Sequence, residues 1–299
     1  MRRQIKNDAV VGITWMVFAS TLFAIGNVFV KAVSPRLPHW EPVFVRSLFA
    51  LIVVGLANVR RPEVFRGRNK RGLILRGVLG TVALMCYYYA ISATQLGVAV
   101  MLAHTAPLFT AIYAFFFLGE RVRPMLVGLI VLGFLGATLI LSPNLSSFDW
   151  RAMIALLAAA LAGGAYTTLR YLRRYDQPST IVFYYAVIGT VLTLPFFLAT
   201  FVRPTFDEGL MLLGVGVTST LAQFGLTYAY RHARAALVSP FSYWTGVVSF
   251  FYGITLFGEV PAATAVIGAA IVTAVGAAIA YTEHRSVAPD GDHAVIEED

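Results

Sequence analysis

Two segments of the sequence repeat the same pattern about 139 residues apart. Tyr89-Ala90 is followed by a long apolar run that ends in Leu118-Gly119-Glu120, and Tyr228-Ala229 is followed by a similar run that ends in Phe257-Gly258-Glu259. A further apolar run comes after each glutamate. The chain is therefore predicted to contain two related halves. Their expected bounds are 1–145 and 146–284, followed by an acidic, disordered tail at 285–299.

The composition places both halves in a membrane. Only 13% of the residues are charged, whereas 58% are hydrophobic, so most side chains cannot face water. A bilayer core of roughly 30 Å requires about 20 apolar residues per helix. Windows of that length predict an all-α protein with ten membrane-spanning helices. The expected spans are 11–33, 42–58, 73–94, 97–118, 125–142, 152–171, 180–202, 209–230, 235–257 and 262–282.

Basic residues between the spans predict the orientation of the chain. If the N-terminus is cytoplasmic, 18 of the 23 lysines and arginines fall in cytoplasmic segments, including seven from Arg60 to Arg76. Short cytoplasmic loops retain such residues, so both termini are expected in the cytoplasm and the protein in a bacterial-type inner membrane. The basic loop is interpreted as a contact with anionic lipid headgroups, not with nucleic acid.

An odd number of spans per half makes the two predicted repeats inverted. The first half begins inside and the second begins outside, which relates them by a pseudo-two-fold axis in the membrane plane. Secondary transporters commonly have this architecture, because two inverted copies can open a midplane site alternately to each side. Transport is therefore the leading functional hypothesis.

The sequence resembles the EamA branch of the drug/metabolite transporter superfamily. The resemblance rests on ten spans in two halves, on Arg46 in the second span, on Pro107 in the fourth, and on the Gly-Glu that ends a span in each half. It covers roughly residues 11–282. The second half departs from the pattern, because Tyr184 or Tyr185 matches Arg46 and Gly246 matches Pro107. The resemblance implies export of small metabolites, amino acids prominent among them, through a central cavity.

Polar aromatic residues are the main candidates for lining such a cavity. His104 and Tyr243 occupy equivalent repeat positions, as do Tyr89 and Tyr228, and these four residues are expected around one site. Tyrosine can hold an amphipathic solute by stacking and hydrogen bonding. The alternatives are that the tyrosines lie in interfacial belts and that His104 is a neutral histidine bonded to a neighbouring helix. Further candidates are Tyr166, Gln223 and Trp244.

Two cations near the outer ends of the first two spans are candidates for receiving a carboxylate. Lys31 and Arg46 fill these positions, and Asn27 lies one turn before Lys31. Both cations could instead extend toward headgroups, or Arg46 could pair with Glu41. Pro107 could mark a hinge or a simple kink.

The acidic residues limit the mechanism. All 15 of them fall in loops, tails or span ends, whereas ion-driven carriers usually bury a carboxylate. We therefore expect a facilitator; a proton-coupled antiporter that uses His104 is the alternative. A lipid or lipid-linked flippase of the same architecture is a further alternative.

An enzyme is not expected, because no nucleophile, base or metal-ligand cluster accompanies the scattered histidines. No cofactor or metal is predicted. The expected partners are a small-molecule substrate and membrane lipids, and the small residues of spans five and ten could also form a homodimer.

Overall fold

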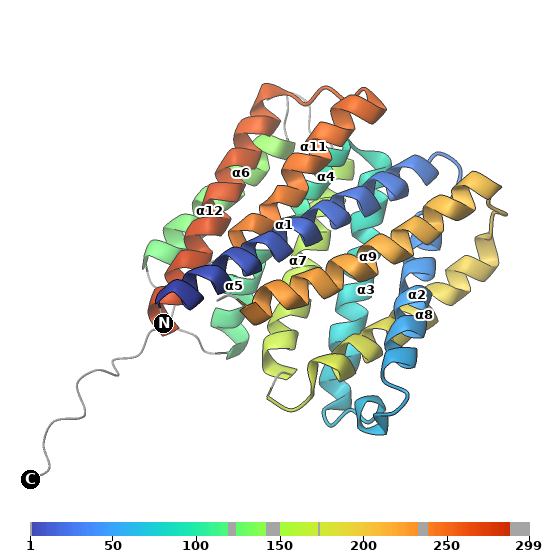
Figure 1. Cartoon of the computed structure of the whole chain (residues 1–299). Coiled ribbons are helices and arrows are strands. Elements are labelled where there is room, and N and C mark those ends of the chain that lie inside the picture. Colours follow the sequence, from blue (N-terminus) through green and yellow to red (C-terminus); the bar gives the residue numbers. More distant parts are fainter. Residues whose placement is uncertain (1, 119–123, 142–149, 173, 233–238, 288–299) are drawn as a thin grey trace, which may run out of the picture.

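The computed structural model describes residues 2–118, 124–141, 150–172, 174–232 and 239–287, and every regular element within these ranges is a helix (Figure 1). Glu120 of the first repeated Gly-Glu lies outside the described residues, as do the predicted boundary at 145 and the tail after 287. The first half contains α1 Arg2–Val33, α2 Trp40–Ala57, η1 Pro62–Phe65, α3 Lys70–Ala93, α4 Leu96–Ala103, α5 Ala106–Leu118 and α6 Pro124–Leu141. The second contains α7 Trp150–Leu172, α8 Pro178–Thr200, α9 Phe206–His232, η2 Ser239–Tyr243, α11 Trp244–Phe257 and α12 Ala263–Val287.

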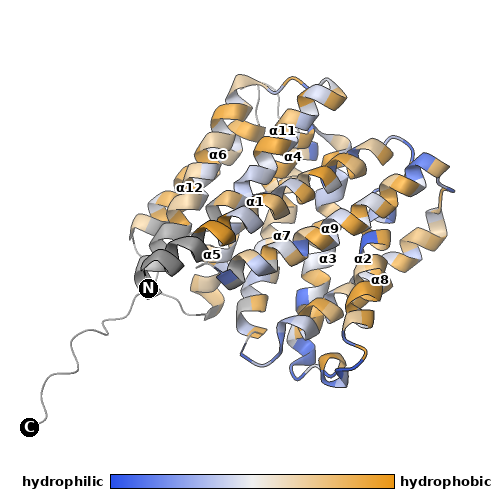
Figure 2. Ribbon diagram, viewed as in Figure 1, coloured by the Kyte–Doolittle hydropathy of each residue, from blue (hydrophilic) through white to orange (hydrophobic). Residues whose placement is uncertain are grey.

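Seven segments of the described residues are long and apolar enough to cross a membrane, and three shorter apolar helices accompany them. Each of these ten segments overlaps one predicted span. The shorter ones are Val127–Leu141, Phe241–Phe257 and Ala263–Ile279. Large apolar side chains are exposed on most helices, and Figure 2 shows that hydrophobic residues predominate along most helices. Such a surface suits lipid as the surrounding solvent.

The helices run between two faces of the bundle. We call the face where α1 begins the N-terminal face; the connections at 58–69 and 174–177 lie there (Figure 1). The connections at 34–39, 201–205 and 258–262 lie on the opposite face. Consequently α3 ends at the opposite face, whereas its repeat equivalent α9 ends at the N-terminal face.

The packing of the helices is unchanged when the two halves are exchanged. Helix α1 packs against α9, and its equivalent α7 packs against α3. Likewise α2 packs against both α8 and α9, and α8 packs against both α2 and α3. Helices α6 and α12 pack against each other, with Gly136 and Gly268 at the contact, where an added Cβ at Gly136 would lie 3.1 Å from the Gly268 carbonyl oxygen. The two halves therefore form one bundle in which each helix finds an equivalent partner.

The fourth predicted span is divided, and its division has a counterpart in the second half. Helix α4 ends at Ala103 and α5 begins at Ala106, so Pro107 lies in the first turn of α5, where a missing N–H costs no helical hydrogen bond. In the second half the 3-10 helix η2 ends at Tyr243 and α11 begins at Trp244. The predicted span 97–118 matches the apolar segment Leu96–Phe117, which is divided into two helices because Pro107 starts a new helix instead of bending a continuous one.

Candidate functional site

His104 and Tyr243 meet where the two divided spans change helix. Their ring centroids are 5.4 Å apart, and the Tyr243 hydroxyl donates a hydrogen bond of 3.3 Å to the His104 carbonyl oxygen. The His104 Nδ1 atom lies 2.8 Å from the carbonyl oxygen of Val100. Tyr243 is only 6% exposed. The pair therefore braces the two helix junctions against each other, which satisfies a carbonyl group that the break in the helix leaves free.

Tyr89 and Tyr228 do not join this pair. The Tyr89 ring lies 5.2 Å from that of His39, near the end of α3 at the opposite face. The Tyr228 ring stacks on Trp15 at 5.4 Å, near the end of α9 at the N-terminal face. Equivalent positions in the two halves lie at opposite depths, so only residues near the centre of the bundle meet their counterparts. The expected grouping of all four residues around one site is therefore wrong.

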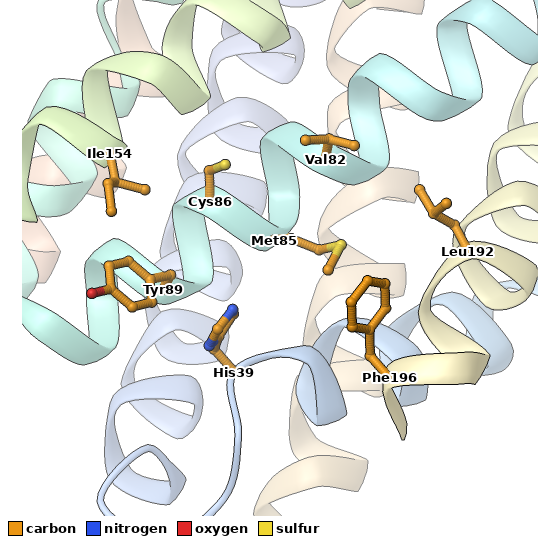
Figure 3. A pocket seen from close by; sticks show the side chains of 8 residues that line it. All are labelled: His39, Val82, Met85, Cys86, Tyr89, Ile154, Leu192 and Phe196. Atoms are coloured by element: carbon orange, nitrogen blue, oxygen red, sulfur yellow. The ribbon is translucent and has the colours of Figure 1, made fainter. Parts of the chain in front are cut away.

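Tyr89 instead lines a cavity of about 410 Å³ on one flank of α3 (Figure 3). The lining residues are His39, Val82, Met85, Cys86, Tyr89, Ile154, Leu192 and Phe196. Figure 3 shows Cys86 and Tyr89 on the same side of α3 as Ile154 of α7, with Phe196 of α8 across from Met85. Burial lowers the pKa of His39 below its ordinary value. The cavity is thus apolar and holds an uncharged histidine at neutral pH.

The opposite flank of α3 carries polar residues that face the inside of the bundle. Successive helical residues turn by about 100°, so Arg76, Tyr87 and Tyr88 point away from the face of α3 that lines the cavity with Val82, Met85, Cys86 and Tyr89. The Tyr87 hydroxyl accepts a hydrogen bond of 2.8 Å from Nδ2 of Asn27 in α1. The Tyr88 hydroxyl accepts one of 3.1 Å from Nη1 of Arg46 in α2. Arg46 therefore points toward α3 and forms no ion pair with Glu41.

Arg76 folds along α3 toward the same interior region. Its guanidinium carbon lies 4.7 Å from the ring centroid of Tyr185 in α8, and Gly80 leaves the space that the guanidinium occupies. Tyr166 of α7 lies within electrostatic range of Arg76, Tyr185 and Arg46. The Tyr166 side chain is 47% exposed.

We call these side chains the polar cluster. Its members are Asn27, Arg46, Arg76, Tyr87, Tyr88, Tyr166 and Tyr185. Asn27 and Tyr166 occupy equivalent repeat positions, and so do Arg46 and Tyr185. Both equivalent pairs contribute to one cluster, which therefore lies between the two halves. The predicted candidates Asn27, Arg46 and Tyr166 come together here.

Arg76 was not among the residues that the sequence singled out. It counted as one of seven basic residues that set the orientation of the chain. A usable signal was present: Arg76 follows Leu73-Ile74-Leu75 instead of other charges, and Gly80 lies four residues later on the same helical face.

The remaining candidates lie outside the polar cluster. The Lys31 ammonium forms an ion pair of 3.0 Å with Glu259 and donates to the Thr94 carbonyl oxygen, so its charge is compensated. The Trp244 indole N–H donates a hydrogen bond of 3.1 Å to the Thr21 hydroxyl, and the Trp244 side chain is 43% exposed. Gln223 is exposed on α9.

The polar cluster has the chemistry of a binding site. It combines two guanidinium groups with four phenol groups and one amide, which can donate hydrogen bonds and stack on a planar solute. Within the described ranges, no group of three or more His, Cys, Asp or Glu side chains could hold a metal ion.

Comparison with known proteins identifies the type of protein to which this bundle belongs. The model of the EamA-like transporter family matches the chain twice, at residues 10–142 and 149–282. The chain belongs to the EamA-like transporter family. It is thus a multi-pass membrane protein of a transporter family within the drug/metabolite transporter superfamily, as the sequence resemblance predicted.

Several relatives match nearly the whole chain. The pseudopaline exporter CntI of Pseudomonas aeruginosa is 33% identical over 274 residues, which are 91% of this chain and 96% of the exporter. A riboflavin transporter of Rhizobium johnstonii is 31% identical over 287 residues, 93% of each chain. An S-adenosylmethionine uptake transporter of Rickettsia prowazekii is 26% identical over 286 residues, 92% of this chain and 94% of its own. A crystal structure with 19% sequence identity matches the fold with a TM-score of 0.60 over 95% of this chain and 99% of its own.

Proposed function

We propose that the protein is an inner-membrane carrier that exports a small amphipathic metabolite by alternating access, with the polar cluster as its binding site. The observation that carries this proposal is that both equivalent pairs, Asn27 with Tyr166 and Arg46 with Tyr185, contribute to one cluster between the halves. A site built from equivalent positions stays at the centre while two related halves rock around it.

The inverted arrangement of ten crossings belongs to the same proposal. Its support is the opposite direction of equivalent helices, such as α3 and α9, between the two faces of the bundle (Figure 1). The N-terminal face carries the basic connection at 58–69, which favours a cytoplasmic position for that face. Both termini are then cytoplasmic.

The polar cluster favours a solute of amino-acid size that has an aromatic or otherwise planar part. Tyr87, Tyr88, Tyr166 and Tyr185 offer ring faces together with hydroxyl groups. Relatives named for transport of riboflavin and of S-adenosylmethionine, and one named as a pseudopaline exporter, support a small-metabolite substrate. Amino acids, aromatic ones among them, are the class we propose to be exported.

The side chains around the polar cluster favour facilitated transport over proton-coupled transport. Among the described residues, no acidic side chain forms an ion pair with Arg46 or Arg76 that could exchange for a coupling proton. The ring of His104, which would carry coupling in the alternative mechanism, contacts the backbone of Val100 and Ser242. A histidine tied to carbonyl groups in this way serves the helix junction.

Counterflow into proteoliposomes tests the proposed function. Vesicles loaded with an unlabelled amino acid should accumulate the same labelled amino acid transiently when wild-type protein is present. Tyr166→Ala should reduce the rate at equal amounts of folded protein, whereas Tyr171→Ala, at an exposed tyrosine on the same helix, should not. The absence of counterflow across a panel of amino acids, nucleosides and polyamines would contradict the proposal. Acceleration by an imposed pH gradient would contradict facilitated transport.

The apolar cavity on the flank of α3 supports the lipid flippase as a second candidate. Val82, Met85, Leu192 and Phe196 offer an acyl chain a matching surface. The polar cluster lies on the other side of the same helix, so a lipid in the cavity would not contact Arg76. Stabilisation of the purified protein by lipid, with no effect of any soluble metabolite, would favour this alternative.

A further inference from the structure

Arg76 presents buried hydrogen-bond donors that have no partner. Its Nε and Nη1 atoms are both buried and form no hydrogen bond among the described residues. Buried donors normally form hydrogen bonds. A buried guanidinium group without an acceptor has lost its hydrogen bonds to water and has no other hydrogen bonds to replace them. The contact with the Tyr185 ring orients the guanidinium plane but accepts no N–H in that plane. The unpartnered donors therefore indicate an acceptor that binds from outside the chain.

A second cation faces the same space. Arg46 donates to the Tyr88 hydroxyl, and it lies within electrostatic range of Tyr185 and Tyr166, which are also neighbours of Arg76. The two ion pairs among the described residues are Lys31 with Glu259 and Arg36 with Glu208, so neither cluster arginine is neutralised by them. Two uncompensated cations within one bundle interior attract an anion strongly, because the surroundings screen charge poorly.

The local fold holds Arg76 ready for such a ligand. An added Cβ at Gly80 would run into Nη1 of Arg76 and lie 2.9 Å from the Tyr185 ring. Glycine at position 80 is thus what allows the guanidinium to lie flat against α3 and Tyr185. A planar guanidinium fixed on an aromatic face offers its N–H fork to a carboxylate with little loss of conformational freedom.

We propose that Arg76, together with Arg46, binds carboxylate groups of the transported metabolite, so that this carrier selects anionic carboxylate-bearing solutes over their uncharged analogues. The inference rests on the proposed function and adds the charge class of its substrate. Arg76 binds one carboxylate through charge-assisted hydrogen bonds from its guanidinium N–H donors. Arg46 provides the charge for a second carboxylate, with Tyr166 between the two arginines as a hydroxyl donor. A solute with a single carboxylate binds Arg76 in preference to Arg46.

A binding assay with matched pairs of ligands tests this inference without transport. Thermal unfolding of the purified full-length protein is followed with N-acetyltyrosine, succinate or citrate, and separately with the corresponding amides. Arg76→Gln removes the charge, and Arg76→Lys keeps the charge but removes the planar fork. Arg71→Gln is the matched control, because Arg71 is exposed on the same helix, five residues earlier.

The inference predicts that at least one carboxylate stabilises the wild type and Arg71→Gln, whereas its amide does not. Arg76→Gln should weaken binding of that carboxylate by about tenfold or more, with a smaller loss in Arg76→Lys. If inorganic phosphate stabilises the wild type and no carboxylate does, the carboxylate assignment is wrong. Equal responses to acids and amides, or equal responses of wild type and Arg76→Gln, would also overturn it.

Counterflow then separates this inference from the proposed function. Transport of a solute with equal inhibition by a carboxylate and its amide would leave the carrier function intact and remove the charge selectivity. Carboxylate binding that depends on Arg76 without any counterflow would support the anion site and contradict the carrier function.

Discussion

Lys31 and Glu259 form an ion pair of 3.0 Å that joins the first half of the chain to the second at the opposite face of the bundle. Glu259 also accepts a hydrogen bond of 2.7 Å from the backbone N–H of Leu96, where α4 begins. Gln95 adds a bond of 3.1 Å from its amide to the Val260 carbonyl oxygen. These contacts close the bundle between α1, α4 and the connection from α11 to α12.

Removing the charge of Glu259 should weaken the contacts that join the two halves at the opposite face. Glu259→Gln keeps an acceptor for Leu96 but leaves the Lys31 ammonium, only 16% exposed, without its counter-ion. We expect a loss on the order of 1–3 kcal/mol of unfolding free energy, measured by thermal unfolding in detergent. Arg36→Gln is the control at the same face, because the Arg36 side chain is 45% exposed, and it should cost less. An equal effect of both substitutions would contradict the account of Glu259.

Gly80→Ala should weaken carboxylate binding without removing any charge. The added methyl group would displace the Arg76 guanidinium from its place between Gly80 and Tyr185. We expect a loss of affinity of about tenfold, similar to that of Arg76→Gln. Gly55→Ala is the control, since an added Cβ at Gly55 meets nothing within 4 Å. Wild-type affinity in Gly80→Ala, combined with lost affinity in Arg76→Gln, would show that Gly80 does not position Arg76.

Gly276→Ala should destabilise the junction at His104 more than Tyr243→Phe does. A methyl group at Gly276 would run into the Tyr243 hydroxyl, which overpacks the interior by about 1–3 kcal/mol. Tyr243→Phe removes only the hydrogen bond to the His104 carbonyl oxygen, worth about 1 kcal/mol. The added methyl group would also clash with the ring carbons Cζ and Cε2 of Tyr243, which phenylalanine keeps, so the double variant should recover only the part of the loss that the hydroxyl causes. Thermal unfolding of the three variants checks this order, and strictly additive effects would contradict it.

Acidification should destabilise the protein through His39. Burial lowers the pKa of His39 below its ordinary value of 6.5, so the folded state favours the neutral ring. This contribution to stability is complete above pH 6.5 and is lost as the pH falls toward the lowered pKa. Thermal unfolding between pH 7.5 and 5 should show a decline that is shallower in His39→Gln. Identical slopes in the two proteins would rule out His39 as the cause.

Much of the fold could be predicted from the sequence, because apolar length is what a bilayer requires of a helix. Each predicted span overlaps an apolar helical segment of the structure, and the family assignment is confirmed. The number of crossings and the orientation of the termini stay predictions. The division at His104 could not be placed, because Pro107 suits either a kink or a helix start. In the structure, α4 ends at Ala103 and α5 begins at Ala106.

The placement of the candidate residues could be predicted in part, for a geometrical reason, and their role in binding stays a prediction. The equivalence of repeat positions correctly predicted that His104 lies next to Tyr243, because both residues lie at helix junctions near the centre. The same reasoning wrongly placed Tyr89 beside Tyr228, because these residues lie near helix ends at opposite faces. Arg76 was missed because sequence position gives the depth of its backbone, whereas the side chain extends along α3 over Gly80 toward the interior.

Access to the polar cluster from both sides of the membrane is the most direct test of the account. Tyr166→Cys in a Cys86→Ser background places the single thiol of the protein beside Arg76 and Arg46. A membrane-impermeant maleimide is applied to proteoliposomes either outside or in the lumen, with protein of one known orientation. Alternating access predicts labelling from each side in the absence of solute. Labelling from only one side under every condition would contradict the carrier mechanism.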